Sequence, residues 1–350
     1  MRNIPSPKFI FENRSFAGVA LDPPDFQPGS WIGAGKAIHD DELDRFVLTA
    51  RPRMAGGNVR GYACNIYLSP DGTSFELVSI VRKEEVQELA GFPVQSIEGT
   101  QILRNPDNGS WHLFVSADTG SEFIWGGVKW ETLLLTSESL KGPWTYRGKV
   151  LENDRGYDSQ QARDATIDVI DGKWLCLYKA KNSSREERPA LAISSNGVDF
   201  TKLGTLTVGG SDELCFISGT LFPLGDGQRF MGLRVQLSDT RAKKPGVVYA
   251  DEHGIGHGGG PAARFVAYDL DIPEMDLRPA FDSTWLPLSP FEHVEHPLLG
   301  YSSLVMDHRR NRILIYLESI DPELSRAIGI NETVERLLVY QAPAGPGVDQ

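Results

Sequence analysis

A short turn between two strand-forming runs constrains this chain most. Asp171-Gly172 separates an alternating run that begins at Gln161 from a second run that ends at Lys179. Asp-Gly between two β-forming segments is a strong hairpin signal. In a hairpin the start of the first strand lies beside the end of the second. We therefore expect Asp164 and Lys179 to lie together, away from the turn, as part of a site or as a structural ion pair.

The same hairpin pattern recurs along the chain. Paired strand-forming runs separated by turn residues also occur at 31–51, 96–118, 217–234 and 301–318. Most are followed by another short pair of strands. Glu98 and Asp164 occupy matching positions in their hairpins, 66 residues apart. A repeat of this length with four strands per unit predicts propeller blades.

Five such units account for nearly all 350 residues. We therefore expect an all-β fold, a five-bladed β-propeller that forms one domain over residues 1–350. The 36 glycines and 22 prolines suit a turn-rich β protein, and a hydrophobic content of 40% is enough for a packed core. Residues 9–11 are expected to form a strand that closes the last blade, and residues 82–90 a short helix.

Composition excludes several classes of function. The net charge of −12 argues against binding to nucleic acid or to an anionic membrane, and no apolar run approaches the 18 residues of a membrane span. We expect no signal peptide in residues 1–11, although a mature chain whose signal has been removed is the alternative. Cys64, Cys176 and Cys215 lie in apolar contexts without metal-ligand spacing, which predicts buried free thiols and a reducing, cytoplasmic compartment. The oligomeric state is not indicated.

We expect no cofactor and no metal site. His253 and His257 have the i,i+4 spacing of metal ligands on a helix, but their glycine-rich surroundings do not favour a helix. A mobile lid is the preferred interpretation of this loop. We also expect the loops at 120–130 and 251–260 to border the mouth of a pocket, since they interrupt blades at long connections.

Several short motifs resemble known enzymes. The stretch Thr136 to Trp144 and the tripeptide Arg163-Asp164-Ala165 resemble five-bladed glycoside hydrolases of families 43 and 32, in which Arg-Asp-Pro opens an inner strand. The segments 48–51, 69–75 and 97–100 show a weaker similarity to family 130, the mannoside phosphorylases and hydrolases. There the last segment reads Glu-Asp-Pro-Arg, whereas Gly99 here replaces the catalytic Asp. The resemblance implies a propeller that cleaves a glycosidic bond, with a carbohydrate as its partner.

Glycosidic cleavage requires two carboxyl groups that flank the scissile bond. Glu98 and Asp164 lie at equivalent starts of inner strands and are the main candidates, although either is also compatible with a structural ion pair or a solvated acid. The resemblance implies a further acid before the first blade, for which Asp22 is a candidate, and Glu213 before the fourth blade is another. We expect burial to raise the pKa of one main carboxyl and a neighbouring cation to lower the other.

The candidate substrate-binding residues are cationic or aromatic. Cations at matching strand ends either balance the acids or contact an anionic group such as phosphate or a uronate. Tryptophans at the rim stack on sugar faces or belong to the core. The candidates are Arg51, Arg163, Lys179, Arg234, Trp31, Trp125, Tyr301 and His296.

Three functions remain open from the sequence. The preferred one is a glycoside hydrolase that resembles arabinofuranosidases, xylosidases and fructosidases. A phosphate-dependent glycoside phosphorylase is the alternative within enzymes. The competing class is a propeller that binds carbohydrate without cleaving it.

Overall fold

The structure of the chain is a computed structural model. It describes residues 4–54, 60–123, 127–154, 156–224, 227–236, 263–283, 298–321, 323–325 and 333–345. These residues are mostly in β-strands, with two short helices among them. Of the residues discussed above, Trp125, His253, His257 and His296 lie outside the described residues.

Consecutive strands pair antiparallel in sets of four. The first set is β3 (Ala37–Asp40), β4 (Arg45–Arg53), β5 (Ala63–Ser69) and β6 (Glu76–Arg82), with β2 (Trp31–Gly33) also paired to β4. The next is β7 (Ser96–Arg104), β8 (Trp111–Asp118), β9 (Trp130–Ser137) and β10 (Thr145–Leu151). It is followed by β11 (Gln161–Ile170), β12 (Lys173–Lys181), β13 (Glu187–Ser194) and β14 (Thr201–Thr205).

The remaining sets lie in the C-terminal half of the chain. One is β16 (Cys215–Leu224), β17 (Gly227–Gln236), β18 (Ala263–Asp271) and β19 (Asp276–Asp282), with the two-residue strand β15 (Thr207–Val208) parallel to β19. The other is β20 (Leu298–Asp307), β21 (Arg312–Asp321) and β22 (Val334–Pro343), completed by β1 (Ser15–Leu21). The hairpins predicted from turn sequences are thus present.

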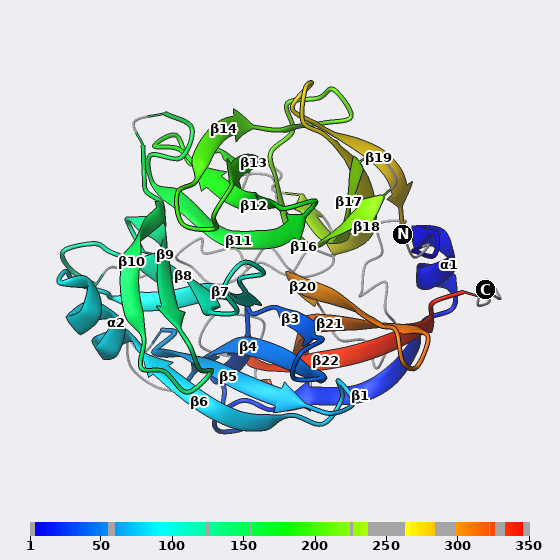
Figure 1. Cartoon of the computed structure of the whole chain (residues 1–350), viewed down its shortest axis with the longest axis horizontal. Helices are drawn as coiled ribbons and strands as arrows, with labels where there is room; N and C mark the ends of the chain where they lie inside the picture. Colours follow the sequence, from blue (N-terminus) through cyan, green and yellow to red (C-terminus); the bar gives the residue numbers. More distant parts are fainter. Residues whose placement is uncertain are drawn as a thin grey trace.

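The first strand of each set lies nearest a common axis (Figure 1). Neighbouring inner strands contact one another in the circular order β3, β7, β11, β16, β20 and back to β3. The arrangement is that of a β-propeller. Because the inner strands run side by side around the axis, their starts meet at one end of it and their turns at the other.

The two termini of the chain meet on one sheet. β1 pairs antiparallel with β22, and β2 continues from β22 through a parallel bridge between Trp31 and Glu335. The prediction of a closing strand at residues 9–11 is wrong, since β1 closes this set instead. Residues 9–11 belong to helix α1 (Pro7–Glu12), because the Ser6 side chain caps its first turn and Pro7 occupies a helix-compatible position. The predicted helix at 82–90 is confirmed as α2 (Lys83–Ala90).

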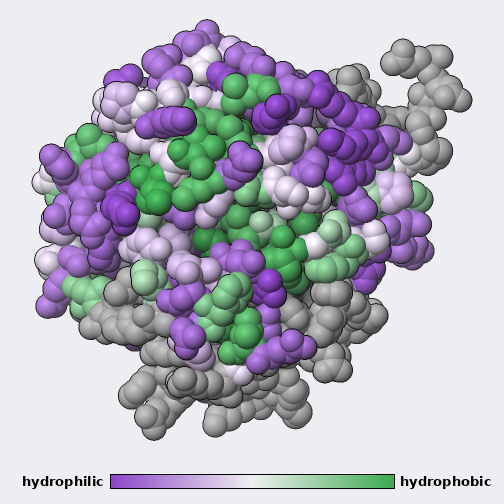
Figure 2. Space-filling model, turned by 90° about the horizontal axis from the view of Figure 1, so that it is seen from below, coloured by the Kyte–Doolittle hydropathy of each residue, from purple (hydrophilic) through white to green (hydrophobic). Residues whose placement is uncertain are grey.

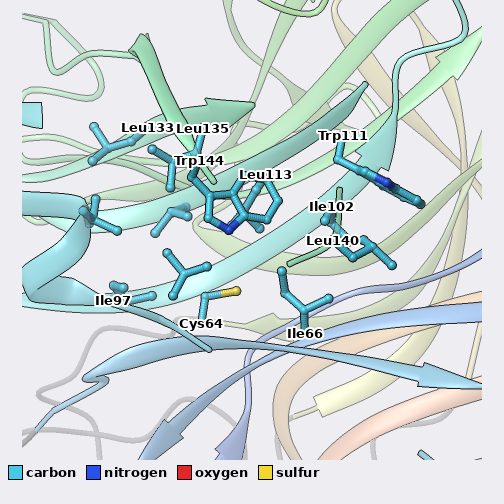
Figure 3. Close-up of a cluster of buried hydrophobic side chains, with 14 of the residues drawn as sticks. Cys64, Ile66, Ile97, Ile102, Trp111, Leu113, Leu133, Leu135, Leu140 and Trp144 are labelled. Atoms are coloured by element: carbon cyan, nitrogen blue, oxygen red, sulfur yellow. The ribbon is translucent and has the colours of Figure 1, made fainter. Parts of the chain in front are cut away.

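The hydrophobic core lies between adjacent sets. Figure 3 shows side chains of β5 facing those of β7, β8 and β9, with Trp144 among them. Cys64 and Ile66 meet Ile102 and Leu113 in this cluster, and all four are fully buried. Such contacts fix each set against its neighbours and thereby fix the geometry of the axial site.

The surface is mixed in polarity. On the face drawn in Figure 2, hydrophobic residues show between hydrophilic ones. Within the described ranges, no helix is long and apolar enough to cross a membrane.

Candidate active site

Interruptions in strand pairing set the geometry at one end of the axis. The β11–β12 register breaks between Arg163 and Thr166, and the β7–β8 register breaks between Ile97 and Thr100. A β-bulge redirects side chains and is common beside active sites. Asp164, inside the first break, has a φ of +55°, a left-handed conformation that is uncommon outside glycine. The backbone therefore departs from regular pairing where the two predicted catalytic residues stand.

Asp164 is the most heavily contacted carboxylate of the site. Its Oδ2 lies 2.9 Å from Lys179 Nζ and 3.5 Å from Arg163 Nε, and it accepts a hydrogen bond of 3.1 Å from the Tyr301 hydroxyl. The predicted proximity of Asp164 and Lys179 is confirmed. Burial opposes ionisation of Asp164, but Arg163 and Lys179 outweigh it and hold the pKa well below its usual range. Asp164 is therefore ionised at neutral pH.

Gly99 brings β7 against Asp164. A Cβ at position 99 would lie 2.7 Å from Asp164 Oδ1 and 2.9 Å from its Cα, so no side chain fits there. The Gly99 N–H instead donates a hydrogen bond of 3.2 Å to Oδ1. The departure from the family 130 motif at this position is thus part of how Asp164 is held.

Glu98 lies between two arginines. Its Oε2 is 3.3 Å from Arg51 Nη2, and its Oε1 is 3.2 Å from Arg60 Nη2. Its side chain is 13% exposed, against 2% for Asp164, so Glu98 is the more accessible of the two. Burial alone would raise the pKa of Glu98. Arg51, Arg60 and Arg163 lower this pKa by more than burial raises it, so the net shift is downward. The expectation that one of the two main carboxyls has a raised pKa is wrong, because cations surround both.

The raised pKa that was expected for Glu98 or Asp164 belongs instead to Glu318, on β21. Glu318 is 1% exposed, and its Oε1 lies 3.3 Å from Arg51 Nη2, so Arg51 contacts both Glu318 and Glu98. Burial raises the pKa of Glu318 to about 7 despite the attraction of Arg51. Burial also raises the pKa of the nearby Glu335, whose carboxyl accepts a hydrogen bond of 2.8 Å from Thr333.

A repeated feature of the sequence points to Glu318. In each predicted hairpin the returning strand ends in a charged residue, and the structure buries every one of them at 8% exposure or less. They are Arg51, Asp118, Lys179, Arg234 and Glu318. A buried charge at the same position of each repeat belongs to the axial site, and this pattern would have added Asp118 and Glu318 to the candidates.

Two tryptophans support the arginines of the site. Trp130 is fully buried, with the guanidinium of Arg163 4.3 Å and that of Arg60 4.8 Å from its ring centroid. Trp31 lies under Arg53 at 4.2 Å, and its indole N–H donates to the Thr333 carbonyl at 3.1 Å. Trp31 is 6% exposed, so its ring packs against arginine rather than presenting a free face for a sugar.

Other predicted residues have partners of their own. Asp22 pairs with Arg336, at 2.8 Å between Oδ1 and Nε, and its side chain is 48% exposed. Glu213 pairs with Arg234, whose Nη1 also donates to the Tyr268 hydroxyl at 3.3 Å. The contacts of the described residues join neither acid to Asp164 or Glu98.

The opposite end of the axis holds a cavity of about 500 Å³. Lys36 and Asp168 lie in its wall together with residues from the turn ends of the inner strands, such as Leu103, Phe222 and Met306. Burial lowers the pKa of Lys36 to about 7 and raises that of Asp168 to about 7. Across the described parts of the chain, no group of three or more His, Cys, Asp or Glu side chains is arranged to hold a metal ion.

Solved structures of glycoside hydrolases share this fold. A family 117 glycoside hydrolase from the marine bacterium Zobellia galactanivorans matches with a TM-score of 0.60 and 15% identity over 99% of this chain and 94% of its own. A thermostable family 43 glycoside hydrolase matches with a TM-score of 0.60 and 12% identity, over 93% of this chain and 96% of its own. The family 32 β-fructofuranosidase of Bombyx mori matches with a TM-score of 0.56 and 12% identity, over 90% of this chain and 62% of its own.

A glycoside hydrolase of family 130 is also similar in structure. The predicted resemblance to families 43, 32 and 130 is therefore confirmed at the level of the fold. By sequence, no family model and no curated protein matches. The chain has the propeller fold that these glycoside hydrolases share.

Proposed function

We propose that this chain is a glycoside hydrolase, a single five-bladed propeller domain over residues 1–350. Each antiparallel set of four strands is one blade in this proposal, which the circular contacts of the inner strands support. The fold is shared with glycoside hydrolases of families 117, 43 and 32. The substrate is a glycoside, an oligosaccharide or a polysaccharide.

One observation carries this proposal. Asp164 and Glu98 start neighbouring inner strands, and both interact with Arg163. Two carboxyl groups converging on an axial site are what glycosidic cleavage requires. Because the pKa of Glu98 is lowered as well, a third carboxyl of the site, Glu318, is the better candidate for the proton donor. The ionised Asp164 suits the base or nucleophile, whereas the buried Glu318, with a pKa of about 7, suits a proton donor near neutral pH.

Phosphorolysis is the second candidate, and the cations of the site favour it. Arg51, Arg60, Arg163 and Lys179 all contact the carboxyls of the site, and phosphate is bound preferentially by such groups. A panel of nitrophenyl glycosides with and without phosphate separates the functions. Release without phosphate indicates hydrolysis, and release only with phosphate indicates phosphorolysis. Binding of sugars without release indicates a non-catalytic carbohydrate-binding protein.

The residue assignment is tested with Asp164→Asn, Glu98→Gln and Glu318→Gln. Loss of a general acid or base costs about 10²–10⁴-fold in rate. On a substrate with a good leaving group, the variant lacking the acid keeps much of its activity, because such a leaving group needs little protonation. The variant lacking the base or nucleophile does not recover. If Asp164→Asn and Glu98→Gln each cleave the substrate of the wild type at a near wild-type rate, this site is refuted. Asp22 and Glu213 would then be tested.

A further inference from the structure

Among the described residues, part of the hydrogen-bonding capacity of Arg163 is unused beside the candidate catalytic carboxylate. Its Nε donates to Gln161 Oε1 at 2.9 Å and lies 3.5 Å from Asp164 Oδ2. Neither of its Nη atoms makes a hydrogen bond within the described residues. The side chain is 11% exposed, more than Lys179 at 7% or Arg51 at 2%. Arg163 is thus the most open of these three cations.

The guanidinium of Arg163 is held in place. Its plane is supported by the Trp130 ring at 4.3 Å, and its Nε is tied to Gln161. A fixed planar guanidinium whose two Nη atoms have no hydrogen bond to a described residue matches the two oxygens of a carboxylate or phosphate, and a preorganised fork loses less entropy on binding. The geometry therefore favours an anion over a neutral hydroxyl.

Cations surround Arg163, but carboxyls balance them. Arg51, Arg60, Arg163 and Lys179 pair with Glu98, Asp164 and Glu318. The carboxyls of Glu187 and Glu335 also interact with cations of this cluster. The preference for an anion therefore follows from the fixed guanidinium of Arg163 and not from the net charge of the cluster.

We propose that Arg163 is the anchor of an oxyanion subsite that binds a carboxylate or phosphate group beside Asp164. The inference rests on the proposed function, and it names the class of ligand that the site selects. The same chemistry has two sources. The oxyanion is the carboxylate of an acidic sugar in the substrate, or it is a phosphate that attacks the sugar in phosphorolysis.

Binding of anions is measured first, because it does not depend on cleavage. The probes are glucuronate, galacturonate and inorganic phosphate, with glucose and galactose as neutral partners, titrated by calorimetry. We expect at least one of the anions to bind and the neutral sugars to bind about 10- to 100-fold more weakly, the range of one or two charge-assisted hydrogen bonds. A higher NaCl concentration should lower the affinity for the anion and leave the affinity for the neutral sugar unchanged.

Two variants and a control test the role of Arg163. Arg163→Gln should lower anion affinity about 10- to 100-fold, and Arg163→Lys, which keeps the charge but loses the fork, should recover only part of it. Arg188→Gln is the matched control. Arg188 lies on β13 with 17% exposure, and it pairs with Glu186 and Asp212. Its loss should change anion affinity less than twofold. Thermal melting of each variant establishes that it is folded.

Nitrophenyl uronides and their methyl esters then separate the two sources of the oxyanion. If the substrate supplies the carboxylate, the uronide is cleaved with the higher kcat/KM and phosphate inhibits competitively. If phosphate is the co-substrate, neutral glycosides are cleaved only when it is present. Either result supports the subsite when Arg163→Gln abolishes the preference for the uronide or the cleavage that depends on phosphate.

The inference and the proposed function fail separately. Cleavage of neutral glycosides without phosphate and without any effect of Arg163→Gln keeps the hydrolase and overturns the subsite. Anion binding that depends on Arg163, without cleavage of any glycoside, keeps the subsite and overturns the hydrolase. Equal affinity of the folded Arg163→Gln and Arg188→Gln variants for every anion also overturns the subsite.

Discussion

The carboxyl group of Glu318 occupies the space that a side chain at position 33 would need. A Cβ at Gly33 would lie 2.4 Å from Glu318 Oε1, 2.6 Å from Cδ and 2.8 Å from Cγ. Gly33 is on β2 and pairs with Arg51, the arginine that contacts both Glu318 and Glu98. The absence of a side chain at position 33 therefore lets a third carboxyl enter the site from β21.

Gly33→Ala should displace Glu318 from Arg51. Overpacking of this kind costs about 1–3 kcal/mol, and we expect the free energy of unfolding to fall by that amount. Gly156→Ala is the control, because a Cβ there has nothing within 4 Å. It should change stability by less than about 0.5 kcal/mol.

The double variant Gly33→Ala/Glu318→Ala tests the cause of the loss. Truncation of Glu318 removes the obstruction, so the two substitutions should be non-additive, with a coupling energy on the order of 1 kcal/mol in a denaturant-based cycle. Additive losses would contradict the packing relationship between Gly33 and Glu318.

Glu318 should also make stability depend on pH. Its pKa is about 7 in the fold, above its ordinary value, so folding favours the protonated acid. This contribution is fully present below the ordinary pKa and is lost as pH rises through 7. The melting temperature of Glu318→Gln relative to wild type should therefore increase between pH 5 and pH 8, by an amount equivalent to about 1–3 kcal/mol.

Glu323→Gln serves as the control for this titration, because Glu323 is exposed on the turn after β21. Its melting temperature relative to wild type should stay constant with pH. A constant difference for Glu318→Gln as well would show that Glu318 is ionised in the fold throughout this range.

Turn chemistry made the hairpins of this fold predictable. The Asp171-Gly172 turn fixed the pairing of β11 with β12, and hence the contact between Asp164 and Lys179. The strand assignment at residues 9–11 failed because an apolar tripeptide is compatible with either structure. The Ser6 cap and the position of Pro7 decide for a helix there, and Ile10 is buried by packing rather than by strand pairing.

Contacts between repeats were not predictable from the pattern of any one hairpin. The pKa of Glu98 is lowered by Arg51 on β4 and by Arg60 in the connection between β4 and β5, both in the preceding set. The Glu318 side chain reaches Gly33 only because the ends of the chain meet on one sheet. Such relationships depend on how the ring closes, which single-strand periodicity does not contain.

The three cysteines should be unreactive in the folded protein. Cys64, Cys176 and Cys215 are buried free thiols, as predicted from the sequence. Burial raises the pKa of Cys64 and Cys215 to about 12, and that of Cys176 as well, so the reactive thiolate is scarce near neutral pH. Ellman's reagent should label less than about 0.1 equivalent at pH 8 and all three thiols in guanidinium chloride. Rapid labelling of any thiol without denaturant would contradict the burial.

The buried amino group of Lys36 joins three inner strands. Its Nζ donates to Ser218 Oγ at 3.1 Å, to the Gly219 carbonyl at 2.9 Å and to the Ser302 carbonyl at 3.1 Å. Lys36→Met removes these three hydrogen bonds, although Ser218 Oγ and the carbonyls of Gly219 and Ser302 keep other partners. Since a hydrogen bond contributes about 0.5–1.5 kcal/mol, the melting temperature should fall by several degrees. Lys173→Met, at the exposed first position of β12, should have no such effect.

The pH dependence of this contribution has a definite sign. The pKa of Lys36 is about 7 in the fold, below its ordinary value of 10.5, so folding disfavours the ammonium form. The contribution of Lys36 to the stability of the wild type should therefore rise as pH increases from 7 toward 10. The pKa of Asp168 is raised to about 7, so the contribution of Asp168 should fall as pH increases from 4 to 7. Denaturant unfolding of wild type, Lys36→Met and Asp168→Asn from pH 5 to 9 separates the two. If the stability of Lys36→Met relative to wild type does not decline as pH rises above 7, then Lys36 is charged in the fold and its three acceptors hold an ammonium ion.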